Sequence, residues 1–176
     1  MLLRGLFLAN LSIVIDADIA RSSGLSEHPI SSGSRNLLDN VSTNGHKVVM
    51  CPLLMEEWRK HRSVYARTWL ASMIAKRRVT FVKEPDILAK SYLLEHIEDT
   101  SLREVALKDV HLVDAALKYD NLIASNDDRA RNAFCGYSVN TGIWRNVAWI
   151  NAISHGEFLK NYLLMQGHMP DDHKLI

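Results

Sequence analysis

The stretch DVHLVDAALKYDNLIASNDDRAR, residues 109–131, decides the fold because a helix, a turn, a buried strand and an acidic turn follow one another in it. Apolar residues at helical spacing predict a helix that begins near residue 101 and ends near residue 117. These residues are Ala106, Val110, Val113 and Leu117. The short apolar run 122–124 predicts a buried strand, and the polar turn 125–128 follows its C-terminal end.

Two acids of this stretch are candidates for a common pocket. Asp109 lies beside Val113 on a helical net, at the edge of the apolar face, where a carboxylate is costly to bury unless something neutralises it. Asp127 follows the C-terminal end of the strand, which is where ligands bind in open α/β sheets. We therefore expect Asp109 and Asp127 to converge.

Length and composition indicate one ordinary globular domain over residues 1–176. Charged residues make up 23% of the chain and hydrophobic residues 47%. The net charge of +1 excludes strong global attraction to nucleic acid, so such a partner would need a local basic patch. Cys51 and Cys135 form no CxxC pair, and we expect them to be unbridged thiols in a reducing cytosol.

The N-terminal residues 1–15 are apolar behind Arg4, as in a signal sequence. An Asp-x-Asp follows at once, and no small-residue cleavage site precedes it, so we expect the lead-in to a buried strand instead. No apolar run approaches the ~20 residues that a membrane span needs. These features predict a cytoplasmic protein without membrane contact.

Strands and helices are expected to alternate along the chain. The predicted strands are 11–15, 47–51, 79–82, 122–124 and 143–150. The predicted helices are 34–44, 52–75, 86–99, 101–117 and 157–165, with a Ser-, Gly- and Pro-rich loop or broken helix start at 22–34 and a mobile tail from 167. Such alternation predicts an α/β fold with a mostly parallel sheet covered on both faces.

Four acids stand where these elements should meet: Asp16, Glu57, Asp109 and Asp127. Glu56 is the alternative to Glu57, which we prefer because Trp58 follows it directly. Converging carboxylates cannot all stay ionised at pH 7 without a cation, and an all-oxygen site favours Mg²⁺ or Mn²⁺ over zinc. Such ions activate water and stabilise a phosphoryl oxyanion, which indicates phosphodiester hydrolysis.

A simpler interpretation exists for several of these acids. A single acid after a strand commonly caps a turn or a helix, and Asp18, Asp127 and Asp128 can each be explained in this way. Asp109 lies inside a helix and is no cap. The recurrence of acids at matching topological positions therefore favours a site.

Five segments resemble the PIN domain, a metal-dependent nuclease fold shared by VapC-type toxins and several RNA-processing enzymes. They occur in family order over nearly the whole chain: SIVIDAD (12–18), CPLLMEEW (51–58), KDVHLVDAAL (108–117), LIASND (122–127) and IWRNVAWIN (143–151). The chain is longer than compact toxins of this kind, and residues 58–104 match nothing diagnostic. This departure bears on the biological role more than on the chemistry.

The resemblance implies a three-layer α/β/α sandwich and a Mg²⁺- or Mn²⁺-dependent endoribonuclease. It implies that the catalytic, metal-binding acids are Asp16, Glu57, Asp109 and Asp127. The residues expected next to these ligands are Asp18, Asp114 and Ser125. RNA is the implied substrate, and a VapC-type toxin would also have an antitoxin protein and a homodimer as partners.

Basic residues that flank the acids in sequence are the candidates for contact with the RNA backbone. They are Arg59, Lys60, Arg62, Arg129 and Arg131. Their simpler interpretation is a solvated helix face. Tyr65 and Trp69 share an apolar stripe with Leu54, so we expect them in the core rather than stacked on bases.

The sequence has two alternatives to the nuclease interpretation. DADIA resembles the first motif of haloacid dehalogenase phosphatases, but that family has Thr or Val where Ala20 stands, and Ser125 lies too close to Asp127 for its later motifs. A catalytically silent PIN-like module that binds RNA or protein stays open. Scattered histidines without HExxH, and the lack of GxSxG, Walker or GxGxxG motifs, exclude the common zinc, hydrolase and nucleotide signatures.

Overall fold

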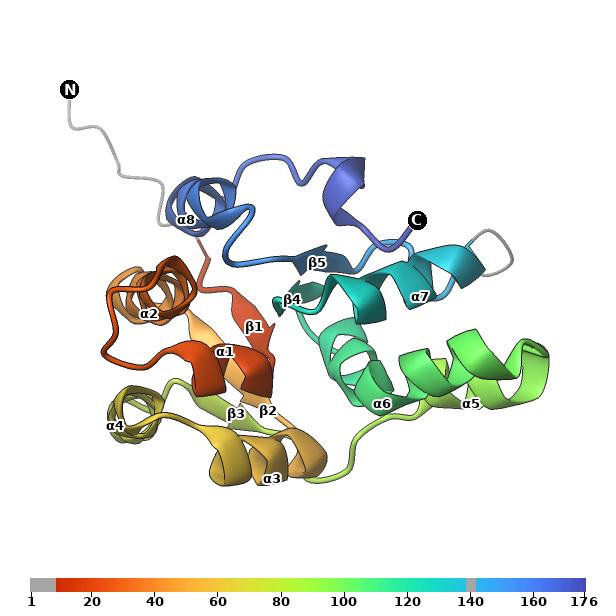
Figure 1. The fold of residues 1–176 in the computed structure, drawn as a ribbon, viewed down its shortest axis with the longest axis horizontal. Coiled ribbons are helices and arrows are strands. Elements are labelled where there is room, and N and C mark those ends of the chain that lie inside the picture. The colour runs from red at the N-terminus through yellow and green to blue at the C-terminus, as the bar shows by residue number, and fades with distance from the viewer. Residues whose placement is uncertain (1–8, 139–141) are drawn as a thin grey trace.

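The computed structural model describes residues 9–138 and 142–176 as a three-layer α/β/α sandwich around one five-stranded sheet (Figure 1). Neighbouring strands all run parallel, in the order β3-β2-β1-β4-β5. The strands are β1 (Ser12–Ile15), β2 (Lys47–Met50), β3 (Val79–Phe81), β4 (Leu122–Ala124) and β5 (Ala148–Ile150). The predicted fold class is confirmed.

Helices cover both faces of this sheet (Figure 1). On one side lie α5 (Leu88–His96), α6 (Thr100–Leu117) and α7 (Asp128–Ser138). On the other side lie α2 (Pro29–Thr43), α4 (Val64–Ala75) and α8 (Gly156–Met165). Two shorter helices, α1 (Ala17–Ser22) and α3 (Pro52–His61), begin just beyond the C-terminal ends of β1 and β2.

The central strands β1 and β4 position the functional end of the sheet. Ile13, Val14 and Ile15 are fully buried, as expected of a parallel strand covered on both faces. Ile15 pairs with Ala124 in the ladder, so the two strands end at the same level. The residues that follow them, Asp16 and Ser125, are therefore neighbours.

The long helix predicted over 52–75 is wrong, because the chain turns at Arg62 and Ser63 and forms α3 and α4. The Ser63 hydroxyl caps α4 by accepting from the Ala66 backbone N–H at 3.0 Å. The Ser63 N–H donates to the Ala20 carbonyl at 2.9 Å, which ties the turn to α1. The apolar spacing stays in phase across the break, so periodicity alone could not reveal it.

The segment 22–34 is more helical than expected. It contains the last residue of α1 and the first turns of α2, which begins at Pro29 instead of residue 34. Leu37, Leu38 and Val41 face the core as predicted. Gly45, just after α2, has a φ of 81°, a backbone conformation that favours glycine.

The C-terminal third differs from the sequence-based prediction in two places. Only Ala148–Ile150 of the predicted strand 143–150 forms a strand. The tail expected to be mobile packs against β5: Leu175 is fully buried, and its N–H donates to the Val147 carbonyl at 2.9 Å.

Three further expectations concern the chain as a whole. Cys51 and Cys135 do not form a disulfide, as predicted. Among the described residues, no helix is long and apolar enough to cross a membrane. Residues 1–8 of the expected N-terminal lead-in lie outside the described part of the chain.

Candidate active site

Carboxylates from several elements line one open cavity of about 510 Å³ at the C-terminal end of the sheet. The acids of this cavity are Asp16, Asp18, Glu57, Asp109 and Asp127. The remaining lining residues are Ala17, Arg21, Ser22, Ile30, His61 and Asn126. The structure thus brings together all four acids expected as metal ligands. Asp18, expected beside them, lines the same cavity.

Asp16 is held at the end of β1 by the turn that follows β4. The Ser125 hydroxyl donates to Asp16 Oδ2 at 2.7 Å and accepts from the Asp127 backbone N–H at 3.1 Å. Asp16 Oδ1 accepts from the Asp18 N–H at 3.4 Å, which makes Asp16 the N-cap of α1. Burial nevertheless raises the pKa of Asp16, because these hydrogen bonds compensate only part of the desolvation.

Asp18 has one oxygen with a partner and one without. Its Oδ2 accepts from the Asn126 backbone N–H at 2.8 Å. Its Oδ1 is buried and has no hydrogen-bond partner among the described residues. Burial and then the charge of Asp16 raise the pKa of Asp18 to about 7. Asp18 is therefore a half-buried acid whose ionised form is only partly compensated by hydrogen bonds.

Asp109 reaches the cavity from α6. Burial, followed by repulsion from Asp16, raises its pKa to about 7, and the charges of Asp127 and Glu57 act in the same direction. His111 opposes this shift. The sequence-based placement of Asp109 at the edge of the apolar face agrees with its partial burial.

Glu57, not Glu56, lines the cavity. Glu56 is exposed and pairs with Lys60 at 2.7 Å on the outer side of α3. Glu57 Oε2 lies 3.2 Å from His111 Nε2, a contact between α3 and α6. The sequence favours Glu57 because Trp58 follows it directly. The Trp58 indole N–H donates to the Ile15 carbonyl at 2.9 Å and ties α3 to β1.

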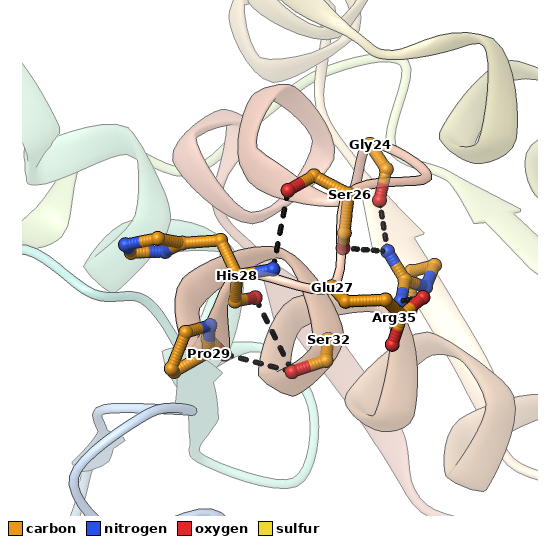
Figure 2. Close-up of polar contacts among 7 residues, drawn as sticks. All are labelled: Gly24, Ser26, Glu27, His28, Pro29, Ser32 and Arg35. Atoms are coloured by element: carbon orange, nitrogen blue, oxygen red, sulfur yellow. Dashed lines mark hydrogen bonds and ion pairs between the residues drawn. The ribbon is translucent and has the colours of Figure 1, made fainter.

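Figure 2 shows the loop between α1 and α2, with Ser26, Glu27 and His28. Ile30, two residues after His28, lines the cavity. Arg35 of α2 points toward this loop and donates to the carbonyls of Gly24 and Ser26, the latter at 2.7 Å. Its other guanidinium nitrogen pairs with Glu27 at 3.1 Å. Arg35 therefore supports the loop and is not one of the cavity residues.

Asp114 does not belong to the cavity, although it was expected next to the ligands. Its carboxylate accepts from the backbone N–H groups of Ala89 at 2.7 Å and Lys90 at 3.4 Å, at the N-terminus of α5. Asp114 lies on the side of α6 that packs against α5. The apolar periodicity of the sequence does not reveal this contact between the helices.

None of the five basic residues expected to contact RNA lines the cavity. Lys60 pairs with Glu56, and Arg131 donates to the Asp172 carbonyl at 2.6 Å, so each has a structural partner elsewhere. Arg21 and His61 line the cavity instead. His61 follows Glu57 by four residues, a helical spacing that could have revealed it. Arg21 was hidden because α1 was not predicted.

The acids line the cavity, but among the described residues they do not form a ready metal-binding group. Within residues 9–138 and 142–176, no three His, Cys, Asp or Glu side chains form a group that could hold a metal ion as they lie. Comparison with known proteins gave no matching family model, no significantly similar curated protein and no significantly similar solved structure. Only the chain's own residues and their geometry therefore bear on its function.

Proposed function

We propose that the chain is a PIN-type endoribonuclease that hydrolyses RNA phosphodiester bonds with Mg²⁺ or Mn²⁺. One observation supports it above all: five carboxylates line one cavity at the ends of parallel strands, and the pKa values of Asp16, Asp18 and Asp109 are raised there. Acids so placed favour a compensating cation. A toxin role, an antitoxin partner, a homodimer and a cytoplasmic location stay predictions of the sequence.

The donor set fits a hard divalent cation. The acids of the cavity offer carboxylate oxygens, which hard divalent cations prefer as ligands. The buried Asp18 Oδ1 has no hydrogen-bond partner among the described residues. The residues that would hold the ion are Asp16, Glu57, Asp109 and Asp127. When bound, the ion would lower the pKa of a water molecule and stabilise charge on the phosphoryl group. The side chains must turn toward one another for this, because they form no such group as they lie.

Two basic residues of the cavity, Arg21 and His61, would orient the substrate. Arg21 and His61 are exposed side chains from α1 and α3 that line the same cavity as the acids. A guanidinium can hold a phosphate through two parallel hydrogen bonds, which fixes the scissile group as well as attracting it. The carboxylates then supply an acceptor for the proton of the attacking water.

A catalytically silent module is the second candidate. The observation that favours it is the lack, in the described part of the chain, of a group of three side chains ready to hold a metal. Such a module would bind RNA or protein equally well with and without a divalent ion. Metal dependence therefore separates the two proposals.

The test is cleavage of a labelled single-stranded RNA of mixed sequence by purified protein, with Mn²⁺, with Mg²⁺ and with EDTA. We expect cutting that requires metal and falls by about 100-fold or more in Asp109→Asn and in Glu57→Gln. Glu56→Gln is the matched control, because it makes the same chemical change one residue away and outside the cavity.

Two outcomes would contradict the nuclease. Equal cutting by wild type and Asp109→Asn would identify a contaminating enzyme. No cutting by a wild-type protein that binds RNA equally with Mn²⁺ and with EDTA would favour the silent module.

A further inference from the structure

We propose that His111 is a positioning residue that orients the Glu57 carboxylate and thereby sets the affinity of the cavity for its divalent cation. This inference rests on the proposed function. His111 lies in α6, two residues after Asp109, and its side chain is only 9% exposed. Its role cannot be predicted from the sequence, because its partner comes from another helix 54 residues away.

The contact has one chemically sensible form. His111 Nε2 lies 3.2 Å from Glu57 Oε2, and an ionised carboxylate only accepts hydrogen bonds. The Nε2–H group must therefore donate to Glu57. His111 Nδ1 is buried and has no partner among the described residues, so the ring is oriented by its contact with the Glu57 carboxylate.

Backbone or hydroxyl donors hold three of the four aspartates of the cavity: Ser125 for Asp16, the Asn126 N–H for Asp18 and the Ala130 N–H for Asp127. The donor to Glu57 is instead a side chain, His111. Glu57 has a longer, more flexible side chain that is 31% exposed. Fixing it before metal arrives removes an entropic cost of binding.

The helices involved are themselves well anchored. α3 is tied to β1 by the Trp58 indole, and α6 contacts β1, β2 and β4. The backbone positions that carry His111 and Glu57 are therefore each held against the sheet. Hydrogen-bond partners of metal ligands typically contribute about 10- to 100-fold to metal affinity.

The experiment titrates Mn²⁺ alone into each protein and measures binding calorimetrically or from the free-ion EPR signal. His111→Leu removes the donor, and we expect its Mn²⁺ affinity to fall about 10- to 100-fold. His111→Gln places an N–H near the position of Nε2, and we expect it to keep most of the affinity. Glu56→Gln is the control, with wild-type affinity expected.

His111→Gln keeps the proposal testable if His111→Leu perturbs folding, and a double-mutant cycle tests whether His111 acts through Glu57. Because His111 acts through Glu57, the pair His111→Leu with Glu57→Gln should bind Mn²⁺ no more weakly than Glu57→Gln alone. Additive losses would overturn the proposal, as would equal weakening by His111→Leu and His111→Gln. Wild-type affinity in His111→Leu would overturn this inference alone, whereas a wild-type protein that binds no Mn²⁺ would overturn the proposed metal site as well.

Discussion

Asp109 and Asp114 stand on the same helix, about one and a half turns apart, yet their surroundings are opposite. Asp114 is 4% exposed and accepts from the backbone N–H groups of Ala89 and Lys90. Asp109 faces the carboxylates of the cavity, and its pKa is raised to about 7. Backbone donors hold Asp114 at a helix N-terminus, whereas Asp109 lies among acids that raise its pKa.

The N-terminus of α5 explains why Asp114 is buried. Ile87, the N-cap of α5, makes no side-chain capping hydrogen bond. Asp114 supplies the missing acceptor from α6, and its negative charge lies at the positive end of the α5 dipole. Burial raises the pKa of Asp114, while the two N–H groups lower it. The same residue type therefore has two different roles on one helix.

The largest effect on stability is expected for Asp114→Ala. This change leaves two buried or half-buried N–H groups without their acceptor, so the free energy of unfolding should fall by about 2 to 3 kcal/mol. Urea denaturation measures it. Asp86→Ala is the control, because Asp86 is an exposed partner of Lys118, and we expect less than about 0.5 kcal/mol there. Equal effects of the two changes would contradict the capping role.

Asp109→Asn should change the free energy of unfolding in the opposite direction. Removing a charge that the other acids repel should raise the free energy of unfolding by about 1 kcal/mol at pH 8 in EDTA. The full conversion, about 1.4 kcal/mol per pKa unit, is reduced because the carboxyl is partly exposed. The variant should become more stable while it loses cleavage. Destabilisation in EDTA would show that Asp109 is a structural acid like Asp114.

The smallest expected effect is the pH dependence of the stability that Asp109→Asn gains. A folded pKa of about 7, above the ordinary value of 3.8, means that the neutral carboxyl stabilises the fold. This contribution is complete below pH 3.8, declines as pH rises and is lost above about pH 7. The stability gap between Asp109→Asn and wild type should therefore narrow from pH 8 to pH 4.5 in EDTA. Denaturation at both pH values measures it, and a constant gap would contradict the shift.

Some differences between expectation and structure have a common physical origin. The break at Ser63 and the start of α2 at Pro29 depend on capping and turn contacts that override the apolar period. The C-terminal tail packs against the domain because Leu175 is buried beside β5. Such contacts join distant segments, so a local pattern cannot disclose them.

The basic residues show the same limit for the site. Arg59, Lys60, Arg62, Arg129 and Arg131 are near the acids in sequence, yet none of them lines the cavity. Lys60 pairs with Glu56, and Arg131 donates to the Asp172 carbonyl. Arg21 reaches the cavity because α1 begins directly after Asp16. Proximity in the chain is a poor guide to proximity in space at the ends of strands, where the direction changes.

The sequence by itself determined the class of fold, because the burial of the strands and their order along the chain depend on local apolar runs. It predicted that Asp16 and Asp127 would meet at the C-terminal ends of parallel strands. It also placed Asp109 at the boundary of a buried helix face. Only the tertiary structure decided the contact between His111 and Glu57, the diversion of Asp114 to α5 and the presence of Arg21 and His61 in the cavity. These depend on which helices pack together, a property of the whole chain.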